Sequence, residues 1–262
     1  MHDPKKIPVI AVDIGSSRTH AAIVDIKETA CLCRRDFPSP DIARYLPKAL
    51  SRMIKETGCA APLPAVIAGG AGSRARAAKK IIKSRGAYPV THCTCRASLP
   101  IAFAYKKPVR LGADRIADAL YAATRYPGRA CIIIDAGTFI TVDIVTASAK
   151  FLGGVIMPGI ATQLHGMNAA APVLPLVNVA ATRIPLPATS TAACMQAGAL
   201  FGSAGGLNLL VRNYREITGK KSVILATGGG WDEIKKLVDF KFVEVPDMTV
   251  IGVALYYCYS SE

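Results

Sequence analysis

The sequence lacks the two short motifs that most often mark a phosphate-binding loop. No G-x-x-x-x-G-K-[ST] segment occurs, which excludes a P-loop. No G-x-G-x-x-G follows the first apolar run, which disfavours a Rossmann dinucleotide site. Aromatic residues are also scarce, at 6% of the chain with a single Trp. Stacking platforms of interleaved aromatic and basic residues are therefore not a feature of this sequence.

Acidic residues are few relative to basic ones. The 262 residues contain 18 Asp and Glu against 32 Lys and Arg, so the formal net charge is +14 at pH 7. Apolar residues make up 51% and charged residues 19%, which is typical of a globular chain long enough to bury a sizeable core. A charge of this size attracts anions, but it does not distinguish a nucleic acid, a lipid head group and a small phosphorylated substrate.

The sequence shows no secretory signal and no disulfide pattern. The apolar run near the N-terminus ends at Asp13, which is too short for a signal peptide. The eight cysteines are spread through a long apolar chain, so we interpret them as thiols in a reducing cytoplasm. The C-x-C pairs Cys31/Cys33 and Cys93/Cys95 do not have the spacing of a structural metal site. We expect a cytoplasmic protein.

Two long segments, 151–182 and 184–211, contain no charged side chain and are long enough to cross a membrane. The first is interrupted by several Gly and Pro residues, and the second is small and polar from Thr189 onward. Four glycines of the second segment would suit a tightly packed helix: Gly198, Gly202, Gly205 and Gly206. We expect a buried helix in a domain or subunit interface, and no membrane partner.

One local pattern occurs twice. The apolar run 7–12 leads into Asp13-Ile14-Gly15-Ser16, and a second strand-like stretch follows over 19–25. The apolar run 131–134 leads into Asp135-Ala136-Gly137-Thr138, and a strand-like stretch continues to Val145. Both copies have the order strand, Asp-x-Gly-hydroxyl, strand, which predicts two hairpins at equivalent places.

Later strands extend the repeat. Residues 65–68 lead into Gly69-Gly70, and residues 223–226 lead into a Gly-Gly turn at Gly228-Gly229. Apolar spacing predicts helices over 40–57, 73–85 and 111–124. The sequence therefore predicts a duplicated α/β unit with a ligand-binding cleft between its halves. We place the halves at residues 1–115, with the first phosphate loop, and 116–262, with the second.

The repeated turns have the chemistry of a polyphosphate site. A Gly in a tight turn lets backbone N–H groups approach a phosphate, and the neighbouring hydroxyl adds a donor. An Asp at the end of a strand supplies hard oxygen for a cation. One such turn is more often an ordinary hairpin turn, because Asp and Gly are common turn residues. Two copies at equivalent places favour a pair of loops that hold the β- and γ-phosphates with their metal.

The densest basic segment lies over residues 74–85. It contains six basic residues: Arg74, Arg76, Lys79, Lys80, Lys83 and Arg85. Nucleic-acid binding is one interpretation. A solvated helix face is the commoner one, and no aromatic residues interleave with these charges to stack bases. We therefore expect no nucleic-acid partner.

The ordered set of motifs resembles the type III pantothenate kinases of the acetate/sugar kinase–Hsp70–actin superfamily. The resemblance runs over nearly the whole chain, and its most specific parts are the Gly-Ala-Asp-Arg and Gly-Gly-x-Ile-x-Pro-Gly blocks. The matching segments are Asp13-Ile14-Gly15, Tyr105-x-x-Pro108-x-x-x-Gly112-Ala113-Asp114-Arg115, Asp135-Ala136-Gly137-Thr138, Gly153 to Gly159, Leu174-Pro175, and Thr191 followed by Gln196-x-Gly198. The resemblance implies duplicated ribonuclease H-like (actin-like ATPase) domains with an interdomain cleft.

The resemblance also implies an activity: transfer of the ATP γ-phosphoryl group to pantothenate, the first step of coenzyme A biosynthesis. It implies Mg²⁺, a monovalent cation such as K⁺ or NH₄⁺, and a homodimer whose dimerisation helices lie in the C-terminal half. Asp114 would be the catalytic base, Asp13 would lie near Mg²⁺, and Asp135 would bind the monovalent cation. ATP would contact Asp13, Ile14, Gly15, Ser16, Ser17, Arg18, Thr19, His20 and Thr138. Pantothenate would contact Tyr105, Gly112, Ala113, Asp114, Arg115 and Thr191, the last of these across the dimer or within its own subunit.

The chain departs from the family pattern after Gly15. Ser16-Ser17 stands where the family usually has Asn followed by Thr or Ser. Ser16 lacks the amide, so we expect one contact of the first phosphate loop to be lost or mediated by water, with Arg18 available to contact a phosphate. Two alternatives stay open: a kinase for another small hydroxylated acid, and a degenerate nucleotide- or DNA-binding regulator without enzymatic activity.

Overall fold

The chain is described by a computed structural model over residues 8–59, 62–69, 72–96, 98–179 and 184–260. Gly70, part of the first predicted Gly-Gly turn, lies outside these residues. The chain forms two compact units. Unit 1 comprises Met1–Gly128, Ala149–Phe151 and Asp247–Glu262, and unit 2 comprises Arg129–Ser148 and Leu152–Pro246.

This grouping differs from the division after residue 115 that the sequence suggested. Helix α3 (Ala113–Arg125) packs against α7 (Met248–Leu255), and both helices belong to unit 1. The packing is close, because a Cβ at Gly252 would collide with the backbone carbonyl of Ala117. The end of the chain therefore returns to the first unit through a helix pair that local patterns do not reveal.

Unit 1 contains a five-stranded sheet with the strand order β3-β2-β1-β4-β5. Strands β1, β2 and β3 are antiparallel, whereas β4 runs parallel to β1 and β5 parallel to β4. The bounds of these strands are β1 Pro8–Ile14, β2 Arg18–Asp25, β3 Ala30–Pro38, β4 Ala65–Ala68 and β5 Val90–His92. The run of buried apolar residues in β1 explains its central place, since a central strand is covered on both faces.

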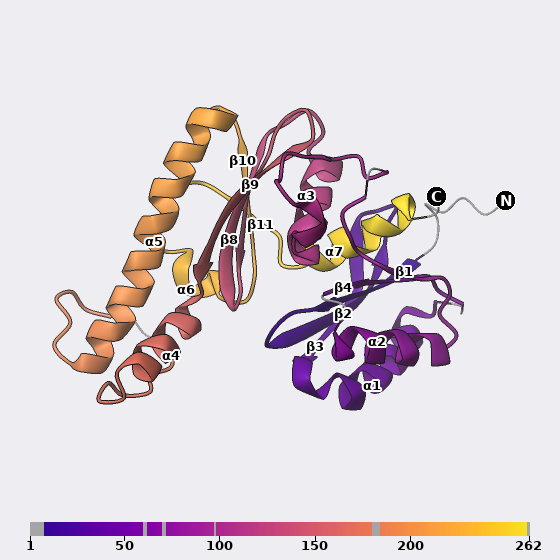
Figure 1. The fold of residues 1–262 in the computed structure, drawn as a ribbon, viewed down its shortest axis with the longest axis horizontal. Coiled ribbons are helices and arrows are strands. Elements are labelled where there is room, and N and C mark those ends of the chain that lie inside the picture. Colours follow the sequence, from indigo (N-terminus) through magenta and orange to yellow (C-terminus); the bar gives the residue numbers. More distant parts are fainter. Residues whose placement is uncertain (1–7, 60–61, 70–71, 97, 180–183, 261–262) are drawn as a thin grey trace. The chain divides into compact units, whose positions relative to one another are not determined.

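Helices cover both faces of this sheet (Figure 1). Helices α1 (Ile42–Thr57) and α2 (Ser73–Ser84) share a core with Ile10 and Val12 of β1. Side chains alternate along a strand, so the intervening residues of β1 face the other side, where α7 packs. The first Asp-x-Gly turn thus follows a strand that is fixed from both sides.

Unit 2 repeats the strand order. Its strands run β11-β10-β7-β8-β9, with β7 and β8 antiparallel and with β10 and β11 parallel to β7 and to each other. Their bounds are β7 Cys131–Ala136, β8 Phe139–Val145, β9 Lys150–Pro158, β10 Val223–Thr227 and β11 Val243–Glu244. A short strand, β6 (Ala102–Phe103), pairs in parallel with the first two residues of β9. The two units therefore have one topology, as the repeat predicted.

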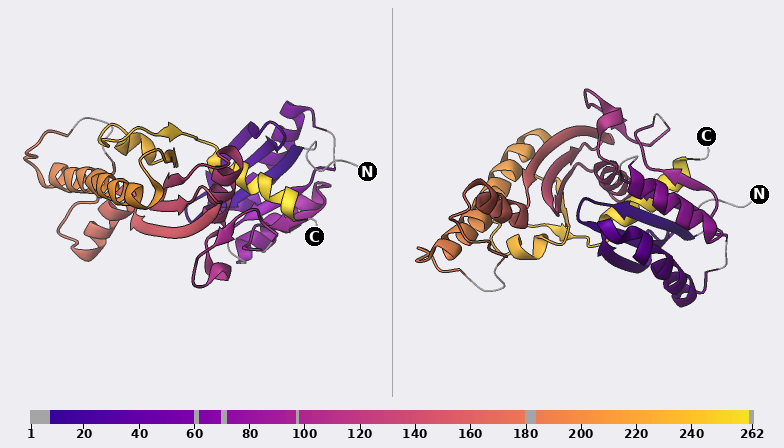
Figure 2. Two further views of the ribbon diagram at one scale, coloured as in Figure 1. Left: turned by 90° about the horizontal axis from the view of Figure 1, so that it is seen from above. Right: turned by 60° about the horizontal axis from the view of Figure 1, so that its bottom comes forward.

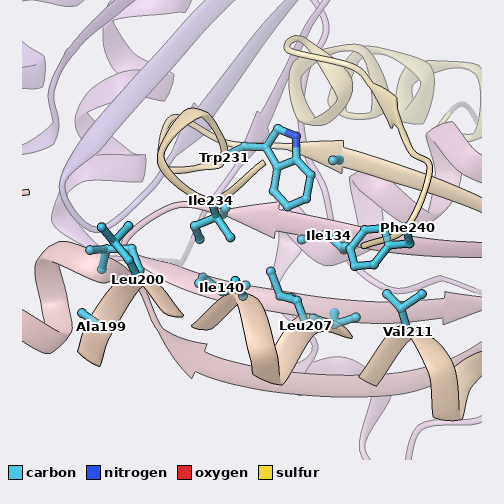
Figure 3. Packing of buried hydrophobic residues seen from close by; sticks show 14 of the residues in the cluster. Ile134, Ile140, Ala199, Leu200, Leu207, Val211, Trp231, Ile234 and Phe240 are labelled. Atoms are coloured by element: carbon cyan, nitrogen blue, oxygen red, sulfur yellow. The ribbon is translucent and has the colours of Figure 1, made fainter. Parts of the chain in front are cut away.

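The core of unit 2 joins its sheet to three helices, which are α4 (Ile160–Ala170), α5 (Thr191–Thr218) and α6 (Trp231–Ile234). Helices α4 and α5 pack against each other (Figures 1 and 2). Figure 3 shows Leu200, Leu207 and Val211 of α5 packed with Ile134 and Trp231. The indole of Trp231 is 1% exposed and is therefore part of the core.

The predicted elements of the repeat are confirmed to within a few residues, including both hairpins, the strand 65–68 and the helices α1 and α2. Helix α3 begins at Ala113, two residues later than predicted. Strands β3 and β9 were not predicted. Strand β3 has only one fully buried residue, Phe37, so its pattern of apolar residues is weak.

Helix α5 is the one helix of the described residues that is long and apolar enough to cross a membrane, and 44% of its apolar window is buried inside the chain. Among the described residues, added Cβ atoms at Gly198, Gly202 and Gly205 would meet nothing within 4 Å outside the helix backbone, whereas a Cβ at Gly206 would lie 3.8 Å from Met157 Sδ. Tight packing of the first three glycines is therefore wrong for contacts within the part of the chain that the structure describes. Their place in a subunit interface stays a prediction.

Candidate active site

The first Asp-x-Gly turn lies between β1 and β2. Gly15 donates its N–H to the carbonyl of Arg18 at 3.0 Å, which closes the turn. A Cβ at Gly15 would lie 2.8 Å from that carbonyl oxygen, so the turn requires glycine here. Ser16, Ser17 and Arg18 are exposed, whereas Asp13 at the end of β1 is only 9% exposed. The turn presents a small polar tip above a buried carboxylate.

Contacts from outside the turn fix its carbonyl groups. The buried Ser39 hydroxyl donates to the Gly15 carbonyl at 2.8 Å, and the Ser39 N–H donates to the Ser17 carbonyl at 3.0 Å. Arg74 Nη1 donates to the Ser16 carbonyl at 3.1 Å and to the Gly15 carbonyl at 3.4 Å. Sequence reasoning missed both Ser39 and Arg74. The spacing of basic residues on α2 placed Arg74 on a solvated face, and no local signal links it to residues 15–16.

The rest of α2 follows the prediction of a solvated basic face. Its buried residues are Ala75, Ala78 and Ile82. Arg76, Lys80, Lys83 and Arg85 are exposed, and Lys79 is half-buried. The helix therefore packs through its small apolar stripe and leaves most of its charges in water.

A row of polar side chains crosses the sheet beside the turn. Asp13 lies opposite His20 on β2, and His20 lies opposite Asp36 on β3. Directly opposed residues of antiparallel strands project from the same face. His20 Nδ1 is 2.8 Å from Asp36 Oδ1, and Arg34 Nε donates to the same oxygen at 2.7 Å. This row was not predicted, because β3 itself was not.

The row is tied to the point where the chain re-enters unit 1. Arg34 Nη1 donates to Asp247 Oδ1 at 2.9 Å. Burial would raise the pKa of Asp36, but the hydrogen bonds from His20 and Arg34 outweigh it and hold that pKa well below its usual range. Asp36 is therefore an ionised member of the network at neutral pH.

One buried cysteine of unit 1 connects the segments that carry two predicted site carboxylates, Asp13 and Asp114. Burial raises the pKa of the Cys93 thiol, and nearby carboxylates raise it further. The Cys93 N–H donates to the carbonyl of Ile67 at 2.8 Å, and the next residue, Ala68, pairs with Asp13 across β1 and β4. The Cys93 thiol donates to the carbonyl of Ala113 at 3.7 Å, which holds the start of α3 beside β5.

Asp114 lies in the first turn of α3, with an exposed carboxylate. Its Oδ1 accepts the N–H of Arg115 at 2.8 Å. An acid in this position is favoured by the partial positive charge of a helix N-terminus. A Cβ at Gly112 would collide with Asp114 Oδ1, so a larger residue at position 112 would require the Asp114 carboxylate to turn away. Asp114 is available to a hydroxyl group that approaches from solvent.

Arg115 points into an aromatic group rather than into water. It is 6% exposed, and its guanidinium lies 5.8 Å from the ring centre of Tyr105 and 5.6 Å from that of Phe151. The Tyr105 and Phe151 rings meet edge to face with centres 6.2 Å apart. The structure thus joins Tyr105 to the Gly112–Arg115 block, two predicted parts of one pocket, through cation–π and aromatic contacts.

The second turn lies between β7 and β8 in unit 2. Gly137 donates its N–H to the Phe139 carbonyl at 2.9 Å. The Thr138 carbonyl accepts the N–H of Gly159 at 3.0 Å and the hydroxyl of Thr162 at 2.6 Å. Gly137 and Thr138 are exposed. The tip of this turn is therefore accessible, as in the first turn, and the predicted cleft between the two turns stays a prediction.

Asp135 precedes this turn and lies beside the Gly-Gly turn after β10. Gly228 has a φ of +93°, and a Cβ there would collide with Asp135 Oδ1 and with the Ala136 carbonyl. Gly230 donates its N–H to that carbonyl at 2.7 Å. The Asp135 carboxylate and the Ala136 carbonyl oxygen thus both lie against Gly228, at a position where a side chain would not fit. Carboxylate and carbonyl oxygens are ligands that suit a hard cation.

The donor set also fits Mg²⁺ shared with a substrate. Within the described ranges, no group of three or more His, Cys, Asp or Glu side chains is placed to hold a metal ion. Mg²⁺ in phosphoryl-transfer sites is usually held by one or two carboxylates together with substrate phosphates. The buried carboxylate of Asp13 below an exposed polar turn has that character.

Thr191 is the first residue of α5 and is exposed. The preceding Ser190 caps the helix, because its hydroxyl accepts the N–H of Ala193 at 3.3 Å. Gln196 donates to the Asn178 carbonyl at 2.8 Å. The structure describes Thr191 only within unit 2, so its contact with a pantothenate pocket stays a prediction.

The chain is similar to curated type III pantothenate kinases. The type III pantothenate kinase of Dehalococcoides mccartyi strain CBDB1 is 35% identical over 150 residues, which cover 57% of this chain and 56% of the relative. The type III pantothenate kinase of Akkermansia muciniphila is 30% identical over 167 residues, which cover 64% of this chain and 68% of the relative. The chain thus spans just over half the length of the first of these relatives.

A solved structure supports the fold. The inorganic polyphosphate/ATP-glucomannokinase of Arthrobacter sp. strain KM is similar with a TM-score of 0.51 and 15% identity, over 96% of this chain and 98% of that one. This likeness and the repeated strand order confirm the predicted actin-like fold class. A family model for type III pantothenate kinase matches residues 9–213, well over half of the sequence. The chain belongs to the type III pantothenate kinase family.

Proposed function

We propose that this protein transfers the γ-phosphoryl group of ATP to the primary hydroxyl of pantothenate, giving 4'-phosphopantothenate in the first step of coenzyme A biosynthesis. The names of its relatives support this activity. The structural observation that carries the proposal is that Cys93 connects the segments of Asp13 and Asp114 within unit 1. Its N–H donates to the Ile67 carbonyl, next to the residue that pairs with Asp13, and its thiol donates to the Ala113 carbonyl, next to Asp114.

The reaction is a direct in-line displacement. The pantothenate hydroxyl oxygen forms a bond to the γ-phosphorus, and the bond between that phosphorus and the bridging oxygen of ADP breaks. Asp114 accepts the hydroxyl proton, since its carboxylate is exposed at the start of α3 and held by the Arg115 N–H. Phosphoryl transfer depends mostly on positioning and charge neutralisation, with one carboxylate to orient the hydroxyl.

ATP is held by the two turns in this proposal. Residues 13–20 form the first phosphate loop, and Thr138 offers its hydroxyl from the second. Asp13 would hold Mg²⁺, which neutralises charge on the phosphates, and Asp135 would hold the monovalent cation. The exposed tip of each turn and the buried carboxylate of Asp13 support these roles.

Pantothenate is bound beside α3. Tyr105 and the Gly112–Arg115 block form one wall, since Arg115 is packed under the Tyr105 and Phe151 rings. The enzyme is a homodimer in this proposal, and Thr191 contacts pantothenate across the dimer or within its own subunit. The enzyme acts in the cytoplasm. None of the eight cysteines, all of which lie in the described residues, forms a disulfide.

The direct test combines purified protein with ATP, Mg²⁺, K⁺ and pantothenate and follows ADP formation. Asp114→Asn should reduce turnover by a factor of about 10² to 10⁴ with little change in melting temperature, because it removes only the proton acceptor. Asp41→Asn is the matched control, since Asp41 is an exposed acid of unit 1 whose side chain makes no cap hydrogen bond. Its turnover should equal that of the wild type.

Two results would contradict the proposal. ADP formation with another hydroxylated acid, but none with pantothenate, would indicate a kinase of different substrate. Absence of turnover together with salt-sensitive DNA binding that is lost when Arg76 and Lys80 are neutralised would indicate a regulator.

A further inference from the structure

The first phosphate loop is held by its carbonyl groups. Three successive carbonyls, those of Gly15, Ser16 and Ser17, accept hydrogen bonds from residues outside the turn. The donors are the hydroxyl and N–H of Ser39 and the guanidinium of Arg74. Ser39 begins the short 3-10 helix Ser39–Asp41 that follows β3, and Arg74 lies at the start of α2, so both are far from the loop in sequence.

Fixing the carbonyls also fixes the direction of the amides. A trans peptide unit is planar, and its C=O and the following N–H point in opposite directions. The Gly15 carbonyl points at Ser39 and Arg74, so the Ser16 N–H points away from them. The Ser16 carbonyl points at Arg74, so the Ser17 N–H also points away from Arg74. Successive N–H groups turned to one side form an anion-binding nest.

The Ser39 contact is preorganised. Ser39 and Thr19 are both fully buried, and their hydroxyl oxygens lie 2.8 Å apart. The single proton of the Ser39 hydroxyl is directed at the Gly15 carbonyl, so Thr19 donates to Ser39. Two buried hydroxyls thus form a chain that ends on the loop. A buried donor of this kind holds one geometry, because its rotamer is locked by packing.

The Arg74 contact adds charge as well as geometry. One guanidinium nitrogen, Nη1, reaches both the Gly15 and the Ser16 carbonyls. Arg74 is exposed in the first turn of α2 and places a positively charged group at the carbonyl side of the loop. A cation behind the loop favours a polyphosphate in front of it.

We propose that Ser39 and Arg74 are positioning residues for the nucleotide: they clamp the carbonyls of residues 15–17 so that the N–H groups of Ser16 and Ser17 face the ATP phosphates. This inference rests on the proposed function for the identity of the anion. It gives a reason why Ser16 suffices in this loop, since backbone amides supply the contact for which the family usually has an Asn side chain. The clamp should act on ATP affinity and leave pantothenate affinity unchanged.

The test compares Ser39→Ala, Arg74→Ala and Arg74→Lys with the control Lys80→Ala. Lys80 lies on the same helix and is exposed. Its substitution by Ala removes one positive charge, as Arg74→Ala does, at a position that makes no hydrogen bond to the loop among the described residues. For each variant we would measure kcat, the KM for ATP and for pantothenate, the Kd for ADP by calorimetry, and the melting temperature. Arg74 is exposed, so its variants keep the test valid if Ser39→Ala does not fold.

Ser39→Ala and Arg74→Ala should each raise the KM for ATP and the Kd for ADP by about tenfold, with the KM for pantothenate within about twofold of the wild type. Arg74→Lys should recover part of the loss, because an ammonium reaches one carbonyl. The clamp is wrong if the Kd for ADP of both Ser39→Ala and Arg74→Ala equals that of Lys80→Ala. It is also wrong if the KM for ATP and the KM for pantothenate rise by the same factor, or if the wild type does not bind ADP.

The proposed function and the clamp fail separately. A wild-type protein that binds ADP but does not phosphorylate pantothenate contradicts the function, while weaker ADP binding by the two alanine variants still supports the clamp. A wild type that phosphorylates pantothenate, with variants whose KM for ATP is unchanged, contradicts the clamp alone.

Discussion

The two Asp-x-Gly turns have similar sequences but are held by different means. Two side chains take part in holding the first: the Ser39 hydroxyl and the Arg74 guanidinium reach the carbonyls of residues 15 and 16, while one backbone N–H, that of Ser39, reaches the carbonyl of residue 17. The second is held mainly by backbone N–H groups, those of Gly159 and Gly230, with one hydroxyl from Thr162. A repeated sequence motif can therefore depend on different partners in its two copies.

This difference predicts different sensitivities. A side-chain donor is lost by a single truncation, whereas a backbone donor is lost only when the backbone moves. The second turn should therefore tolerate side-chain truncation around it but not an added Cβ at the glycines that bring the backbones together. The first turn should respond to both kinds of change.

The largest effect is expected at Gly228. Its φ of +93° is strained for other residues, and a Cβ would collide with the Ala136 carbonyl and the Asp135 carboxylate. Gly228→Ala should lower the free energy of unfolding by about 2–4 kcal/mol, measured by urea denaturation. Gly229→Ala is the control, because a Cβ there meets nothing within 4 Å, and it should differ from the wild type by less than about 1 kcal/mol. Equal losses in both variants would contradict the close-approach explanation.

The equivalent glycines of the two turns give the next comparison. A Cβ at Gly15 would lie 2.8 Å from the Arg18 carbonyl, whereas a Cβ at Gly137 would lie 3.7 Å from the Phe139 carbonyl. Gly15→Ala should cost about 1–2 kcal/mol of unfolding free energy, and Gly137→Ala less than about 0.5 kcal/mol. Thermal unfolding of both variants checks the order. A larger loss at Gly137 would reverse the comparison.

The charged row beside the first turn predicts a pH dependence. The pKa of Asp36 is lower in the folded chain than its ordinary value of 3.8, so its stabilising contribution is complete above that value and is lost as the pH falls through the folded pKa. Asp36→Asn should destabilise the protein at pH 7 by less than about 1 kcal/mol, since the pair is partly exposed. The difference from the wild type should shrink below pH 3.8. A difference that grows in acid would contradict the assignment.

The smallest effect is expected at Thr162. Thr162→Val removes the hydroxyl bond to the Thr138 carbonyl but leaves the Gly159 N–H on the same oxygen. The KM for ATP should change by less than about twofold, against about tenfold for Ser39→Ala. Steady-state kinetics on Thr162→Val and Ser39→Ala, measured in parallel, give the two KM values for ATP that this comparison needs. Similar increases would show that the second turn also depends on side chains.

The predictions from sequence succeeded where a pattern was local. The alternation and apolar runs around Asp13 and Asp135 predicted both hairpins, and the Gly-Ala-Asp-Arg block predicted the start of α3 within two residues. They failed where burial comes from distant segments. Strand β3 has a weak pattern because only Phe37 is fully buried, and the role of Arg74 depends on a turn 59 residues away.

The sequence alone determined the duplicated architecture and the identity of the turn residues, because strand periodicity and the conformational needs of Gly are properties of neighbouring residues. Only the tertiary structure decided that Cys93 connects the segments of Asp13 and Asp114, that α7 joins the first unit, and that Ser39 and Arg74 hold the first turn. These facts depend on which strands pair and which helices pack. Both are set by burial of the whole apolar surface rather than by any short segment.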